Sequence, residues 1–133
     1  MYLNHATILA LASLFPALTM QSALLPRQRG CYCQTSTGSP KTEDITNVIN
    51  ELHGYDADAI CAQTNDAASQ CTTLVSHNSA AISICGGLDD TTNCQDVAKY
   101  ANIIQQQCLN TGLERSGGQY VISPSLRVEV ISS

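Results

Sequence analysis

The seven cysteines are the residues of this chain best suited to chemistry. They all follow an apolar N-terminal stretch, and they are Cys31, Cys33, Cys61, Cys71, Cys85, Cys94 and Cys108. In an oxidising compartment such cysteines form disulfide bonds, which help a small domain whose hydrophobic core is limited. Seven is an odd number, so at most three intrachain disulfides form and one cysteine stays unpaired. All seven are therefore disulfide candidates, and spacing removes some of the possible pairings.

Spacing rules out some of the pairs. Cys94 and Cys108 are fourteen positions apart. On one helix they would be separated by about 21 Å, which is too far for a disulfide. We expect Cys31 and Cys33 to point to opposite faces of a strand and therefore not to pair. The helix with Cys94 and Cys108 is then expected to be tied to a sheet, with partners among Cys31, Cys33, Cys71 and Cys85.

The unpaired cysteine has two interpretations. It is either a buried thiol that does not react, which we favour, or the site of an intermolecular disulfide that links two chains into a dimer. Zinc is a rival use, because Cys31 and Cys33 resemble half of a zinc site. The second closely spaced pair that such a site needs is absent. The sequence therefore predicts no metal and no cofactor.

A catalytic centre based on histidine has little support. His53 and His77 accompany many serines and aspartates, but no serine lies in a nucleophile elbow or another local signature. His77 falls in an expected hairpin turn and His53 at the end of an expected helix, where the helix dipole favours a cation. We predict structural roles for both.

Paired carboxylates are the other candidates, because two of them can supply the acid and the base of a glycosidase. The pairs are Glu43 and Asp44, Asp56 and Asp58, and Asp89 and Asp90. Acidic residues near helix starts are expected for capping and for the helix dipole. Asp56 and Asp58 lack the spacing of a calcium-binding EF-hand loop. We predict no catalytic residue, and Asp89 and Asp90 are the pair worth testing.

The N-terminal residues predict export. Residues 6–20 are apolar apart from three hydroxyl side chains, a run that suits a signal peptide and is short for a membrane span. We expect a signal peptide at 1–22 and a pro-segment at 23–29. Arg27 and Arg29 form a basic processing site in that segment, although a short basic loop is an equal alternative. Residues 30–133 would then be a single cysteine-rich mature domain.

Charge excludes several kinds of partner. The chain has six basic and eleven acidic residues, and removal of Arg27 and Arg29 leaves a net charge of −7. An acidic surface repels phosphate, so we expect no nucleic-acid binding. Anionic membranes are disfavoured for the same reason, and we expect no stable membrane insertion.

Hydrophobic periodicity predicts two helices and five strands. Ile45, Val48, Ile49 and Leu52 recur at helical spacing after the N-cap candidate Thr42. A second helix begins after Asn93 or Thr92 and extends to about Asn110. Expected strands lie at 30–36, 71–75, 80–85, 119–122 and 126–131. Residues 55–69 are expected to form a loop, with a helical turn within it as an alternative.

This order of elements predicts the fold class. A strand, helix, strand, strand, helix, strand and strand contain the split β-α-β pattern of ferredoxin-like sandwiches with one extra strand. We therefore expect an α+β fold, a disulfide-stabilised two-layer sandwich. Its antiparallel sheet would carry both helices on one face.

The chain resembles the small cysteine-rich secreted proteins of filamentous fungi, and among them the killer-toxin-like effectors. The resemblance rests on the leader, the basic site, the opening Cys31-Tyr-Cys33, a capped helix, and a late helix with Cys94 and Cys108 before Gly117-Gly118. The segment from Ile45 to Leu52 lacks the cysteine that members often carry in the first helix. The resemblance implies an α/β sandwich held by disulfides, secretion into the host apoplast, and a role as a toxin or virulence effector. It transfers no functional residue to this sequence.

Three functional hypotheses follow. The first is a non-enzymatic secreted effector or toxin-like protein that binds a host protein or acts with a second secreted protein. The second is a secreted antimicrobial or inhibitor protein that acts on competing microbes. The third is a small extracellular hydrolase that uses Asp89 or Asp90.

Overall fold

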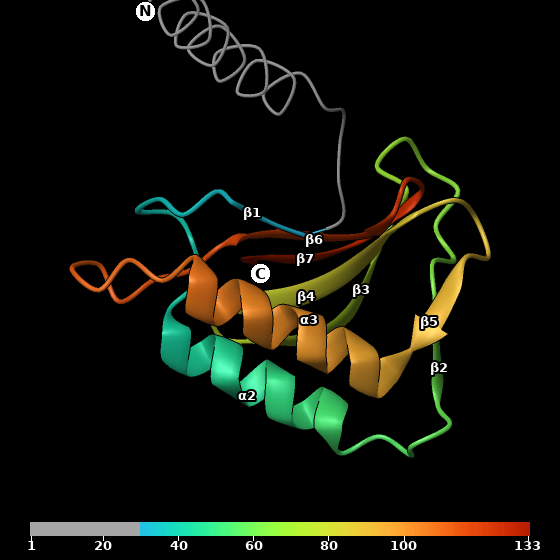
Figure 1. Ribbon diagram of the computed structural model, residues 1–133, viewed down its shortest axis with the longest axis horizontal. Helices are drawn as coiled ribbons and strands as arrows, with labels where there is room; N and C mark the ends of the chain where they lie inside the picture. Colours follow the sequence, from blue (N-terminus) through green and yellow to red (C-terminus); the bar gives the residue numbers. More distant parts are fainter. Residues whose placement is uncertain (1–29) are drawn as a thin grey trace, which may run out of the picture.

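The fold pairs an antiparallel β-sheet with two α-helices that cover one of its faces (Figure 1). The computed structural model describes residues 30–133. The expected signal peptide at 1–22, the pro-segment at 23–29 and the processing residues Arg27 and Arg29 lie outside the described residues. Neither helix within residues 30–133 is long and apolar enough to cross a membrane.

Seven strands and two helices make up the described chain. In chain order they are β1 (Gly30–Cys33), α2 (Thr42–His53), β2 (Ile60–Ala62), β3 (Cys71–His77), β4 (Ala80–Gly86), β5 (Thr91–Asn93), α3 (Cys94–Gln107), β6 (Gly118–Ser123) and β7 (Leu126–Ser132). The order expected from the sequence is present, and β2 and β5 are additions to it.

Five strands form the main sheet in the order β1-β6-β7-β4-β3, and every neighbouring pair is antiparallel. Because β7 is antiparallel to both β4 and β6, these two strands are parallel to each other, and α3 connects them. The β4-α3-β6 unit is thus a split β-α-β with β7 between its strands. The predicted class, an α+β two-layer sandwich with disulfides and both helices on one face, is confirmed.

Helix α2 forms because its apolar residues recur at helical spacing and face the sheet. Ile45, Val48 and Leu52 are fully buried. Lys41 occupies the N-cap position, one residue before the expected Thr42, and its side chain makes no capping hydrogen bond. The segment from residue 41 is instead fixed through its backbone, since the Thr42 N–H donates to the Glu114 carbonyl at 3.1 Å.

Helix α3 begins at one of the two caps that the sequence predicted. The Asn93 side chain accepts hydrogen bonds from the backbone N–H groups of Gln95 and Asp96, at 2.8 and 3.3 Å. The helix ends at Gln107, earlier than the expected Asn110. The reason is tertiary, because the Asn110 N–H donates to the Arg115 carbonyl at 2.9 Å and starts a loop that returns to β6.

The core lies between the two layers. Strand β4 lies beside the central strand β7, where Ile82 pairs with Val130 and Ile84 with Val128, and all four are buried. The helices contribute Ile45, Val48, Ile49, Leu52, Val97, Ala98, Ala101 and Ile104.

The two-stranded sheet of β2 and β5 lies where a loop was expected. It pairs residues 60–62 with residues 91–93, and three residues are too few to display an alternating pattern. Contacts distant in sequence hold it in place. Cys61 is bonded to Cys94 at the start of α3, and the Gln63 N–H donates to the Asp90 carbonyl at 2.9 Å.

Candidate functional site: a thiol beside a disulfide

Three disulfides connect the elements of the described domain. Cys33 is bonded to Cys108, Cys61 to Cys94, and Cys71 to Cys85, over sequence separations of 75, 33 and 14 residues. Cys31 has a free thiol. The first bridge joins β1 to the end of α3, the second joins β2 to the start of α3, and the third crosses the β3-β4 hairpin. Both ends of the longer helix are thus attached covalently.

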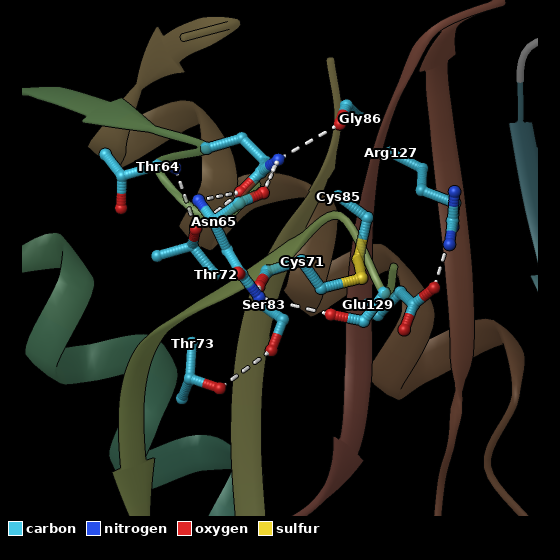
Figure 2. The surroundings of a disulfide bond; sticks show 12 residues. Thr64, Asn65, Cys71, Thr72, Thr73, Ser83, Cys85, Gly86, Arg127 and Glu129 are labelled. Carbon is cyan, nitrogen blue, oxygen red and sulfur yellow. Dashed lines mark hydrogen bonds and ion pairs between the residues drawn. A yellow bond between two sulfur atoms is a disulfide. The ribbon is translucent and has the colours of Figure 1, made fainter. Parts of the chain in front are cut away.

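These pairings differ in part from the expected ones. Cys108 pairs with Cys33, one of its expected partners. Cys94 pairs with Cys61, which lies outside the expected set because β2 was not recognised as a strand. Cys71 and Cys85 face each other in register across the β3-β4 hairpin and bond to each other rather than to α3 (Figure 2).

The first bridge has a third sulfur beside it. The Cys31 Sγ lies 3.5 Å from the Cys108 Sγ, which is bonded to Cys33. Cys108 is buried, Cys31 is half-buried and Cys33 is exposed. Burial raises the pKa of the Cys31 thiol above its ordinary value. Two of the three sulfurs therefore share a bond, and the third touches it.

Strand geometry places the three sulfurs together. The expectation that Cys31 and Cys33 point to opposite faces is wrong, because side chains two positions apart on a strand share a face. Both lie on β1 and face α3, opposite Tyr120 and Gly118 of β6. Gly118 permits the close approach of β1, since a Cβ there would collide with the Tyr32 carbonyl oxygen. The Cys-x-Cys spacing was the signal that could have predicted this cluster.

Thr35 fixes the other side of the cluster. Its Oγ1 donates to the Cys108 carbonyl at 2.5 Å and accepts from the Gly117 N–H at 3.2 Å. The hydroxyl thus connects the segment after β1 both to the end of α3 and to the start of β6. Nothing in the sequence pattern indicated this role for Thr35.

A shallow, open hollow adjoins the bridge. Residues 33–35 line one side of it and residues 107–111 the other. Leu109 is exposed in this second segment. The hollow is wide open to solvent, so it resembles a contact surface more than an enclosed ligand pocket.

Two members of the acidic pairs, Asp44 and Asp90, make structural hydrogen bonds. The Asp44 carboxylate accepts from the Ser79 Oγ at 2.6 Å and from the Ser79 N–H at 3.1 Å, and so attaches α2 to the β3-β4 turn. The Asp90 carboxylate accepts from the Gly87 N–H at 3.0 Å within its own loop. Asp89 and Glu43 are exposed. Neither pair has both carboxylates directed into a common cleft.

The remaining candidates lie on the surface. Asp56, Asp58 and His53 are exposed near the end of α2. His77 is exposed on β3, and its Nε2 lies 3.2 Å from the Asn78 Nδ2. The structure brings neither histidine to an aspartate-serine pair at hydrogen-bond distance in the manner of a catalytic triad.

Within residues 30–133, two groups of side chains contain residue types that can bind metals. One is the cluster of Cys31, Cys33 and Cys108, and the other consists of Cys71, Cys85 and Glu129. The bridges engage two sulfurs in each group, and the Glu129 carboxylate accepts from the Arg127 Nε at 2.7 Å (Figure 2). As oxidised, the first group offers a single thiol and the second a single, already paired carboxylate.

Comparison with known proteins adds no relative to these observations. No family model, curated protein or solved structure matches this chain. The resemblance to killer-toxin-like effectors therefore stays a prediction from the sequence.

Proposed function

We propose that this chain is a secreted effector or toxin-like protein that acts by binding a host protein, without catalysis. The observation that carries the proposal is the set of three disulfides within residues 30–133. Such crosslinks are typical of small domains exported to an oxidising space. They also fix the surface before a partner arrives, which lowers the entropy lost on binding.

The hydrogen bonds of the acidic residues support a function in binding and not in catalysis. The carboxylates of Asp44 and Asp90 accept hydrogen bonds from backbone N–H groups and a hydroxyl of neighbouring turns. A catalytic acid or base has to be free to reach a substrate proton. The acidic excess instead serves recognition, because a net charge of −7 over residues 30–133 attracts a partner with a basic surface.

We place the binding surface at the hollow between residues 33–35 and 107–111. Leu109 is 41% exposed there. Its burial by a partner would contribute on the order of 1 to 2 kcal/mol. The surrounding backbone is fixed by Thr35 and by the Cys33–Cys108 bond, so the surface is preformed.

A matched pair of variants tests this placement. Leu109→Arg is expected to weaken binding to the host protein about tenfold or more, because an apolar contact is replaced by a charge. Ile60→Arg is the control, since Ile60 is 64% exposed on β2 at the other end of the domain (Figure 1). The oxidised protein is immobilised, host extracellular proteins are applied, and the affinity of the retained protein is measured by titration. Equal retention by wild type and both variants would exclude the hollow as the surface.

Two further assays separate the proposal from its rivals. Growth inhibition of competing microbes, without a retained host protein, would favour the antimicrobial hypothesis. Hydrolysis of a polysaccharide or peptide panel that disappears in Asp89→Asn or Asp90→Asn would favour the hydrolase. A non-reducing peptide map of the native product tests export, because it gives both the mature N-terminus and the disulfides. Material with reduced thiols that still carries residues 1–29 would contradict secretion.

A further inference from the structure

The contact between Cys31 and the Cys33–Cys108 bond allows chemistry that neither group has alone. A sulfur-to-sulfur distance of 3.5 Å is van der Waals contact, from which a thiolate attacks a disulfide. Cys31 carries the free thiol of the described domain. The nucleophile and the bond that it would break are therefore already adjacent.

We propose that Cys31 and Cys33 exchange as the partner of Cys108, and that this exchange makes Cys33 a site of covalent modification by low-molecular-weight disulfides. The exchange does not require the binding function proposed above, but it acts on the same surface, because Cys33 and Cys108 both line the hollow. It also differs from a reaction at the free thiol seen in the structure, because the modified residue is Cys33 and not Cys31.

The exchange needs no outside oxidant or reductant. Cys31 loses its proton, and its thiolate attacks the Cys108 Sγ. The Cys31–Cys108 bond forms, the Cys33–Cys108 bond breaks, and Cys33 leaves as a thiolate that takes up a proton from solvent. One thiol and one disulfide are present before and after the step.

The second step uses an external disulfide. The Cys33 thiolate attacks one sulfur of a small molecule R–S–S–R. A mixed disulfide Cys33–S–S–R forms, and the other half leaves as the thiolate RS⁻. The outcome is a domain with a Cys31–Cys108 bond and a modified Cys33.

The difference in burial explains why Cys33, once released, reacts with an external disulfide. Cys31 is half-buried, and burial raises the pKa of its thiol, so little thiolate forms there at neutral pH. Cys33 is exposed and borders the hollow, where solvent stabilises a thiolate and a reagent can approach. Both residues face Cys108 from one edge strand that contacts the sheet through β6 alone, so the switch requires only a local shift of β1.

Oxidised glutathione tests the proposal on the wild-type protein. The oxidised chain is incubated with it at about pH 8.5, where more thiolate is present, then quenched with acid, alkylated and digested. Chymotrypsin cleaves after Tyr32, so Cys31 and Cys33 fall on different peptides. We expect glutathione on the Cys33 peptide and Cys31 bonded to Cys108. Glutathione on Cys31 with Cys33 still bonded to Cys108, or no adduct at all, would overturn the proposal.

Two variants complete the test. Cys31→Ser removes the attacking thiol and keeps the Cys33–Cys108 bond, so we expect no glutathione adduct on it; an adduct equal to that of wild type would contradict the exchange. Cys33→Ser is expected to contain no titratable thiol, because Cys31 then bonds to Cys108. Two titratable thiols in the folded variant would show that Cys31 cannot take the place of Cys33. The wild-type map decides the question even where this variant does not fold.

Discussion

At the scale of single residues, Asp44 contributes to stability through its charge. The Ser79 hydroxyl, with further hydrogen bonds from the Ser79 N–H and Asn78, holds the pKa of Asp44 below its ordinary value of 3.8. Because the pKa is lower in the folded chain than in the unfolded chain, the ionised carboxylate stabilises the fold above about pH 3.8. That contribution is lost as the pH falls through the folded-state pKa.

The variant Asp44→Asn tests this contribution. We expect a lower free energy of unfolding at neutral pH than in wild type, and a smaller further loss on acidification, because the titrating group has been removed. Urea denaturation from about pH 7 to about pH 2 measures both. Asp58→Asn is the control, since Asp58 is exposed. An acid-induced loss of the same size in Asp44→Asn and wild type would contradict the assignment.

Gln63 is a second residue whose role depends on the fold. It is fully buried. Its Nε2 donates to the Asn65 and Gly86 carbonyls at 2.8 and 3.1 Å, and its Oε1 accepts from the Asn65 N–H at 2.6 Å and the Thr72 Oγ1 at 2.7 Å. One side chain thus satisfies polar groups of the 63–70 loop, β3 and the end of β4.

Replacement of Gln63 would leave those groups without partners. We expect Gln63→Leu to lower the free energy of unfolding by about 1–3 kcal/mol. The control Gln106→Leu changes the same side chain at an exposed position of α3, and we expect almost no effect from it. Chemical denaturation of the two variants gives the comparison, and equal losses would argue against a structural role for the Gln63 network.

At the scale of the elements, the start of α3 depends on one cap. Asn93 accepts two backbone N–H groups of the helix, and its Nδ2 donates to the Ala57 carbonyl at 2.6 Å. We expect Asn93→Ala to cost about 1 kcal/mol. Thr92→Ala should change the stability by less than about 0.5 kcal/mol, because Asn93 and not Thr92 is the N-cap of α3. Thermal unfolding of both variants distinguishes the two positions, and a larger loss for Thr92→Ala would reverse the assignment.

The elements that the sequence predicted are those with long apolar periodicity. Ile45 to Leu52 and Val97 to Ile104 supply two turns or more of buried stripe, and the strands of the two long hairpins are apolar-rich runs of six or seven residues. The elements that it missed are short and held from a distance. Strand β2 is three residues long and depends on Cys61–Cys94, a bond between segments that local pattern cannot connect.

The same distinction applies to the candidate site. Each cysteine was identified from the sequence, but the contact between Cys31 and Cys108 depends on the register of β1 against β6 and on where α3 ends. Local periodicity fixes neither. Thr35 lay in no motif, and its position is set by the carbonyls of residues more than seventy positions away.

At the scale of the whole molecule, the disulfides differ in the elements that they join and in the length of the loop that they close. Cys71–Cys85 joins strands that already pair along their length, with one register shift between Thr73 and Val75. Cys61–Cys94 attaches a three-residue strand to α3 and closes a longer loop, of 33 residues. Loop closure in the unfolded chain favours the fold more for the longer loop.

Double serine variants test this ranking. We expect the loss of Cys61–Cys94 to lower the free energy of unfolding by about 3–4 kcal/mol and the loss of Cys71–Cys85 by about 2–3 kcal/mol. Both variants are compared by urea denaturation under oxidising conditions, with circular dichroism as the readout. A larger loss for the Cys71–Cys85 pair would mean that native contacts, and not loop closure, set the order.

The place of β7 in the sheet constrains how the chain is made. This strand comes last of the described elements, yet it lies between β4 and β6 and hydrogen-bonds to both. Until β7 has been synthesised as far as Ser132, no strand joins the β3-β4 part of the sheet to the β1-β6 part. The apolar residues of β4 also lack their neighbours Val128 and Val130 until then. Assembly of the complete five-stranded sheet is therefore delayed until nearly all of residues 30–133 have been synthesised.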